Sequence, residues 1–164
     1  MGDRVLGSDP DLVEGLARRL TERGETVAVA ETTAGGLVSA ALVAVSGSSA
    51  YFERGIVAYS KMAKISSLGM DEAELDSFGA VSVETAVAMA TAAHELSGAT
   101  YGIAETGIAG PIRGRSPKPI GTVHLAVASA ERVTSRDVVL EGDRTGIREG
   151  IVGALLGMLA EELG

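Results

Sequence analysis

Two adjacent hydroxyl side chains, Thr32 and Thr33, follow an apolar run and precede the pair Gly35 and Gly36 in the stretch VAVAETTAGGL. This order predicts a strand, a tight polar turn and the start of a helix. At such a junction, side chains face the crevice of an open α/β sheet and the helix-start N–H groups point outward. The stretch therefore predicts a hydroxyl nucleophile with an oxyanion-binding pair of N–H groups near Gly35 and Gly36. The alternative is a helix cap without chemistry, since threonine commonly caps helices.

A hydroxyl nucleophile needs a base, and the stretch VAYSKMAKI offers Lys64, with Tyr59 five residues before it. Tyr59 is expected to end a strand, and Lys64 to lie on a short helix. A lysine in an apolar pocket loses its proton more easily, and the Tyr59 phenol could hydrogen-bond the amine or the nucleophile. The alternative is a solvated Lys64 and a Tyr59 packed in the core. His94 lies inside a helical pattern and His124 within a predicted strand, so both are expected to be packed or surface residues.

A second strand-to-turn junction, ETGIAGP, contains Thr106, Gly107 and Gly110. Backbone amides of such a turn can approach a phosphate or a ribose closely. The glycine spacing matches neither GxGxxG nor GxxxxGK[ST], so the turn is not a standard nucleotide-binding fingerprint. Its interest comes from the basic residues that follow it.

Those basic residues are Arg113, Arg115 and Lys118, and no Asp or Glu occurs between Thr106 and Ala130. The chain as a whole is acidic, with a formal net charge of −8. A small anion could be drawn to this segment. The alternative is a solvated basic loop, which is the usual role of such a cluster.

Composition limits the class of protein. The 164 residues with 46% hydrophobic content suit one domain over 1–164, and the absence of cysteine excludes disulfides and thiolate chemistry. The net negative charge and the five aromatic residues argue against nucleic acid or an anionic membrane as partner. The amino end has no signal-peptide pattern and no apolar run approaches about 18 residues, so we expect a cytoplasmic protein.

The periodicity of apolar residues predicts alternating helices and strands, then a hairpin. Helices are expected over 8–24, 37–45, 61–69, 71–78, 82–98 and 143–164, and strands over 26–30, 54–60, 100–106, 120–129 and 133–141. This order predicts a single-domain α/β fold, a three-layer α/β/α sandwich with a mixed sheet of about five strands.

Five segments, in this order, resemble a known family: AETTAGGLVSAAL, GSSAYFERGIVAYSKMAKISSLG, GAVSVETAVAMA, TGIAGP and KPIGTVHLAVA. They resemble the C-terminal domain of the competence/damage-inducible protein CinA, the nicotinamide-nucleotide amidase family. The closing GDRTGIREG also looks like the final helix of that family. The resemblance covers most of residues 26–130.

The resemblance implies hydrolysis of the carboxamide of nicotinamide mononucleotide to nicotinate mononucleotide and ammonia, without a metal or other cofactor. It also implies that the protein is a homo-oligomer, a dimer or higher. The only other partner that it implies is the nucleotide substrate. Thr32 falls on the family's nucleophilic serine, and Tyr59 and Lys64 fall on its tyrosine and lysine. The positions expected to bind substrate are Thr33, Gly35, Gly36, Thr106, Gly107, Gly110 and Arg113.

Three departures from the family pattern bear on activity. The usual A-E-S-C-T-G-G reads AETTAGG here, so Thr32 carries a methyl group that restricts χ1 and Ala34 lacks a hydroxyl. Lys61–Met62 stands where the family motif Y-S-N-E-A-K has N-E. The glycine-rich loop reads PIRGRS where the family commonly has P-x-G-G-S. Two other classes therefore stay open: a pyridine-nucleotide-binding module with weak or no turnover, and a structural oligomerisation domain.

Overall fold

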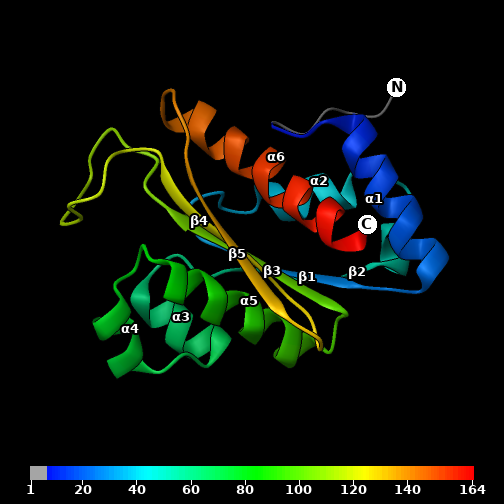
Figure 1. Ribbon diagram of the computed structural model, residues 1–164, viewed down its shortest axis with the longest axis horizontal. Coiled ribbons are helices and arrows are strands. Elements are labelled where there is room, and N and C mark those ends of the chain that lie inside the picture. Colours follow the sequence, from blue (N-terminus) through cyan, green and yellow to red (C-terminus); the bar gives the residue numbers. More distant parts are fainter. Residues whose placement is uncertain (1–6) are drawn as a thin grey trace.

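A mixed five-stranded sheet lies between two layers of helices (Figure 1). The structure is a computed structural model and describes residues 7–164. The strands, in the order β2-β1-β3-β4-β5 across the sheet, are β1 Val27–Glu31, β2 Phe52–Val57, β3 Tyr101–Gly107, β4 Thr122–Ala128 and β5 Val133–Val139. The predicted three-layer α/β/α sandwich is therefore confirmed.

The helices follow the predicted order. They are α1 Pro10–Arg23, α2 Leu37–Val43, α3 Lys61–Leu68, α4 Glu72–Phe78, α5 Val83–Ser97 and α6 Arg144–Leu163, with a short 3-10 helix η1 Ser48–Ala50 that the sequence did not predict. Side chains of Asp9, Ser60 and Ser82 accept backbone N–H groups at the starts of α1, α3 and α5, as capping residues do. No helix within residues 7–164 is long and apolar enough to cross a membrane.

The direction of the strands creates a crevice at the centre of the sheet. β1 pairs in parallel with both β2 and β3, and β4 is antiparallel to its neighbours β3 and β5. The chain leaves β1 toward β2 and leaves β3 toward β4, so the two exits diverge. Ligands of open α/β sheets bind where strand connections diverge in this way, beyond the carboxyl ends of the strands.

The two faces of the sheet are covered by different kinds of core. On one face, α1, α2 and α6 pack mainly branched side chains such as Leu16, Leu42 and Leu155 against the strands. On the other face, α3, α4 and α5 pack mostly alanine and methionine. Small side chains let α5 approach the sheet closely, and Gly102 of β3 lies directly beneath Ala90 and His94 of α5.

Several element ends lie a few residues from their predicted positions, and the end of the second strand matters for the site. The second strand was expected over 54–60 with Tyr59 at its end, but β2 ends at Val57. Its partner β1 ends at Glu31, which pairs with Val57 and whose carbonyl accepts the Ala58 N–H at 2.9 Å. Residues 58–60 have no strand left to pair with, so Tyr59 lies in the turn before α3.

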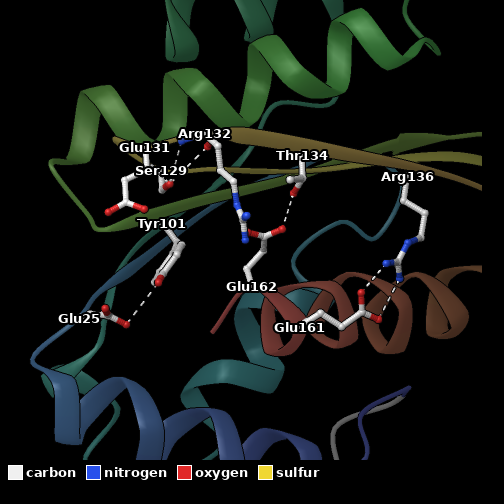
Figure 2. A network of polar contacts seen from close by, with 9 residues as sticks. All are labelled: Glu25, Tyr101, Ser129, Glu131, Arg132, Thr134, Arg136, Glu161 and Glu162. Carbon is white, nitrogen blue, oxygen red and sulfur yellow. Dashed lines mark hydrogen bonds and ion pairs between the residues drawn. The ribbon is translucent and has the colours of Figure 1, made fainter. Parts of the chain in front are cut away.

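Polar contacts fasten the edge strand β5 to the carboxyl end of α6 (Figure 2). Thr134 donates to Glu162 at 2.8 Å, Arg132 forms an ion pair with Glu162 at 2.7 Å, and Arg136 pairs with Glu161. The arginines are exposed, so each pair adds little stability alone. Together they connect β5 to the end of α6, while the apolar core supplies most of the stability.

The close approach of α5 to β3 gives a stability test. A Cβ at Gly102 would overlap the Ala90 carbonyl oxygen and the His94 backbone nitrogen, which cannot move aside. We expect Gly102→Ala to lower the free energy of unfolding by about 2 to 4 kcal/mol in urea titrations. As a matched control, a Cβ at Gly15 in α1 would meet no atom of residues 7–164 within 4 Å apart from the backbone of its own helix, so Gly15→Ala should raise the free energy of unfolding by up to about 1 kcal/mol. Equal effects of the two substitutions would contradict this account of the packing.

Candidate active site

A cavity of about 720 Å³ opens beyond the carboxyl ends of β1 and β3, within the size range of small-molecule sites. Residues from both diverging turns line it, together with the start of α3, the α4–α5 connection, the 107–118 loop and Arg144 of α6. Eight of the ten predicted site residues are among its lining: Thr32, Thr33, Tyr59, Lys64, Thr106, Gly107, Gly110 and Arg113. The fold thus brings together residues that are more than 70 positions apart in the chain.

The two threonine hydroxyls are bound to the end of β3. Thr32 Oγ1 donates to the Glu105 carbonyl oxygen at 3.1 Å, and Thr33 Oγ1 donates to the Gly107 carbonyl oxygen at 3.0 Å. Both side chains are buried but line the cavity. The Thr32 oxygen therefore has a fixed position at the cavity wall, and only its hydrogen must turn for the oxygen to react.

Lys64 is buried at the same cavity. Only 3% of the residue is exposed, and its amine donates to the Tyr59 carbonyl oxygen at 3.3 Å. Burial lowers the pKa of Lys64, while the negative charge of Glu105 opposes that shift. A solvated Lys64, the alternative that the sequence left open, is excluded by this burial. An amine whose pKa is lowered by desolvation is suited to accept a proton.

Tyr59 contributes in a different way from the one expected. Its backbone carbonyl, not its phenol, receives the Lys64 amine, and its phenol oxygen accepts from Arg144 at 3.2 Å. The Tyr59 residue is 62% exposed, so it is not a core tyrosine. The phenol lies at the rim of the cavity, where it can meet a ligand but does not contact the amine.

The glycine pair does not form the oxyanion site that the sequence suggested. Gly35 and Gly36 are not part of the cavity lining, and the Gly36 N–H donates to Glu31 Oε2 at 2.9 Å. The same buried carboxylate accepts the N–H groups of Val38 and Ser39 and the Ser39 hydroxyl. The Glu31 carboxylate lies at the amino end of α2, where these groups supply the hydrogen-bond donors that a buried carboxylate requires. The Gly36 N–H is therefore unavailable for an oxyanion.

Glu105 is a site residue that the sequence analysis missed. Its Oε1 accepts the N–H groups of Thr32 at 2.7 Å and Ala34 at 2.9 Å, and it is completely buried. Its Oε2 is buried without a hydrogen-bond partner among the described residues. Burial raises the pKa of Glu105 to about 7, since it outweighs the two N–H groups that favour the carboxylate. Glu105 therefore holds the Thr32 turn and changes charge near neutral pH.

A signal for Glu105 was present in the sequence. The triplet Ala-Glu-Thr occurs at 30–32 and again at 104–106, each time at the end of an apolar strand and two or three residues before an Ala-Gly pair. The structure pairs these strands in parallel with Ala30 opposite Ala104. A carboxylate repeated at the carboxyl ends of two buried strands would have predicted a pair of buried acids at this crevice.

Two arginines of α6, Arg144 and Arg148, brace the site. Arg148 donates to the carbonyl oxygens of Thr33 and Ala34 at 3.1 and 3.0 Å. Arg144, one turn earlier, donates to the Gly110 carbonyl oxygen at 2.9 Å as well as to the Tyr59 phenol. The final helix thus connects the turn after β1, the turn after β3 and the start of α3.

The charged side chains that line the cavity are all basic. They are Lys64, Arg113, Arg115, Lys118 and Arg144, and no Asp or Glu of residues 7–164 is among the lining residues. Arg113 is exposed and its side chain makes no polar contact with any described residue. This lining is compatible with the small anion that the basic segment suggested, and binding of an anion stays a prediction.

Comparison with known proteins decides the family. The sequence model of the CinA C-terminal domain matches residues 9–163 of this chain. The chain belongs to the CinA family. A CinA-like protein of Frankia casuarinae is 45% identical over 94% of the chain and 36% of its own length, and one of Geotalea daltonii is 42% identical over 99% and 40%. The chain thus spans less than half the length of these CinA relatives.

Solved CinA-family structures have the same fold. The competence damage-inducible protein A of Klebsiella pneumoniae superposes with a TM-score of 0.91 at 31% identity, covering 94% of this chain and 96% of that one. The competence/damage inducible protein CihA of Agrobacterium tumefaciens gives 0.88 at 39% identity, covering 93% of each chain. The family resemblance stated from the sequence is therefore confirmed, as is the fold.

The raised pKa of Glu105 predicts how stability varies with pH. Between its ordinary pKa of 4.5 and about 7, the native protein holds a proton that the unfolded chain has lost. Stability from this group is full at low pH and falls as the pH rises through that window. Glu105→Gln stays neutral, so we expect the loss of unfolding free energy between about pH 5 and pH 8 to shrink by about 1 to 3 kcal/mol.

Urea titrations at both pH values measure this difference. Glu95→Gln, an exposed substitution on α5, serves as the control and should leave the pH dependence of the parent unchanged. A Glu105→Gln protein with the same pH dependence as the parent would show that Glu105 is ionised in the same way when folded and unfolded.

Proposed function

We propose that this chain is a nicotinamide-nucleotide amidase, which hydrolyses the carboxamide of nicotinamide mononucleotide to nicotinate mononucleotide and ammonia. The observation that carries the proposal is that the Thr32 hydroxyl and the buried Lys64 amine line one cavity whose charged lining residues are all basic. A hydroxyl and an amine of lowered pKa suit attack on an amide, and the basic lining suits a phosphate. The family resemblance supplies the choice of substrate.

In the first half of the reaction, neutral Lys64 accepts the proton of the Thr32 hydroxyl as the oxygen attacks the carboxamide carbon. The hydroxyl hydrogen must first turn away from the Glu105 carbonyl oxygen. The C–N bond then breaks, and the nitrogen leaves as ammonia with the proton from Lys64. An ester between Thr32 and the nicotinoyl group remains.

In the second half, water attacks the ester and gives a proton to Lys64. The carbon–oxygen bond to Thr32 breaks, Thr32 takes that proton from Lys64, and the product acid loses its own proton to solvent and leaves as nicotinate mononucleotide. Both tetrahedral intermediates carry negative charge on oxygen, which the basic groups of the lining offset. The N–H groups of Thr32, Ala34 and Gly36 hold Glu105 and Glu31 instead.

Glu105 supports this chemistry by position and by charge. Its Oε1 fixes the backbone on both sides of Thr33, so it sets where the Thr32 oxygen lies. Ionised Glu105 raises the pKa of Lys64, whereas burial lowers it. Protonated Glu105 therefore leaves a larger fraction of Lys64 in the neutral, proton-accepting form.

The nucleophile is tested by removing the hydroxyl. Thr32→Ala should lower kcat for ammonia release from nicotinamide mononucleotide by about 10³-fold or more, because the covalent route is lost. Thr32→Ser keeps the oxygen and removes the methyl that restricts χ1, so it should retain or exceed the parent rate. A coupled ammonia assay measures all three proteins. Parent-level release by Thr32→Ala would overturn the assignment of the nucleophile.

The base is tested by a cation that cannot lose its proton. Lys64→Arg should lower kcat by about 10²-fold or more at every pH, since a guanidinium stays protonated. Lys61→Arg on the exposed side of the same helix is the control and should leave kcat unchanged. Equal rates for Lys64→Arg and the parent would exclude Lys64 as the base.

The competing function is a nucleotide-binding module of the same fold without turnover. The replacement of the family serine by Thr32 favours it, because the extra methyl crowds the attack path. Titration calorimetry with nicotinamide mononucleotide, combined with the ammonia assay, separates the two functions. Binding with product supports the amidase, and binding without product supports the module.

A further inference from the structure

Lys118, which lines the cavity, is held in place by two acceptors. Its amine donates to the Val81 carbonyl oxygen at 2.5 Å and lies 3.2 Å from Nε2 of His124. The other ring nitrogen of His124, Nδ1, lies 2.7 Å from Asp137 Oδ1. A continuous chain of contacts thus runs from edge strand β5 through β4 to a cation at the cavity.

The donor and acceptor roles along this chain follow from chemistry. A carboxylate accepts only, so Nδ1 of His124 carries the hydrogen that Asp137 receives. In the neutral imidazole, Nε2 then has a lone pair directed at the Lys118 ammonium. Asp137 therefore sets the tautomer of His124 that can accept from Lys118.

The sheet fixes the position of this histidine. His124 is paired with Asp137 on one side and with Thr106 on the other, so the three side chains lie on one face of neighbouring strands. His124 is only 7% exposed. Thr106, in turn, donates to the Ala80 carbonyl oxygen at 2.7 Å, next to the Val81 carbonyl that Lys118 binds. The ammonium of Lys118 is therefore held by a strand and a turn that are both well ordered by hydrogen bonds.

Lys118 differs in this respect from the other basic residues of its loop. Arg113 and Arg115 are exposed, and their side chains make no polar contact with any described residue. An ammonium has three donors, and Lys118 uses two of them on Val81 and His124, which leaves one for a ligand. A cation that is already ordered loses less entropy on binding than a free arginine side chain does.

We propose that Lys118, oriented by His124 and Asp137, binds the phosphate of a nucleotide monophosphate in this cavity. The inference rests on the proposed function for the substrate and adds the group that recognises its anionic end. Lys118 is the binding residue, and His124 and Asp137 are positioning residues. Arg113, the position that the family resemblance suggested, is secondary to it.

The test uses two ligands that differ only by the phosphate, nicotinamide mononucleotide and nicotinamide riboside. Calorimetry is done in a Thr32→Ala background, so that turnover does not disturb the titration. We expect Lys118→Met to weaken binding of the mononucleotide by about 10- to 100-fold and binding of the riboside by less than about 3-fold. Lys61→Met removes the same charge outside the cavity and should change neither affinity.

The positioning role is tested at His124. His124→Phe removes the acceptor, so the KM for the mononucleotide should rise about 3- to 10-fold with kcat little changed. His124→Gln keeps an acceptor for Lys118 and a donor for Asp137, and should recover most of that loss. A fall in thermal stability without a change in KM would assign His124 a structural role only.

The outcomes separate this inference from the proposed function. Equal weakening of both ligands by Lys118→Met, no weakening, or a parent protein that binds the mononucleotide no better than the riboside would each overturn it. Should the parent release no ammonia while Lys118→Met still weakens only the mononucleotide, the amidase proposal fails and the phosphate site stands.

Discussion

The site depends on the need of two buried carboxylates for hydrogen-bond donors. Glu31 and Glu105 lie at the carboxyl ends of neighbouring parallel strands, and both are fully buried. Among residues 7–164, Glu31 takes four donors at the start of α2, whereas Glu105 takes two backbone N–H groups on one oxygen and none on the other. Between them they hold the turn that carries Thr32. Losing either would leave buried N–H groups unpaired, which is costly in a protein interior.

The hydrogen bonding and burial of Glu105 explain its raised pKa. The donors around Glu31 stabilise a carboxylate. Glu105 has fewer donors and also meets the charge of Glu31, and both conditions favour its protonated form. The variable charge therefore lies beside Thr32 and Lys64, where proton transfer would take place.

The sequence predicted the fold well, because the signals for it are local. Apolar periodicity and capping residues such as Asp9 and Ser82 depend on neighbours in the chain, and the helices begin where they indicate. Eight of the ten predicted site residues line one cavity, but the contacts that Lys64, Tyr59 and Gly36 make differ from the predicted ones. Whether Lys64 contacts the Tyr59 phenol or its carbonyl, and whether the Gly36 N–H is free, depends on side-chain directions that only the packed turns determine. The Ala-Glu-Thr repeat marks Glu105 in the sequence, but its contact with the Thr32 turn depends on pairing with a strand 74 residues earlier.

Charge selects the ligand over a short range. The chain carries a net charge of −8, so its distant field repels an anionic nucleotide, while the cavity lining attracts it. At physiological ionic strength, screening limits both effects to about 8 Å. Exposed carboxylates farther than that from the cavity have little influence on an anion bound there. For the proposed nucleotide ligand, we therefore expect the cations that line the cavity to contribute more to affinity than the acidic surface of the rest of the chain takes away.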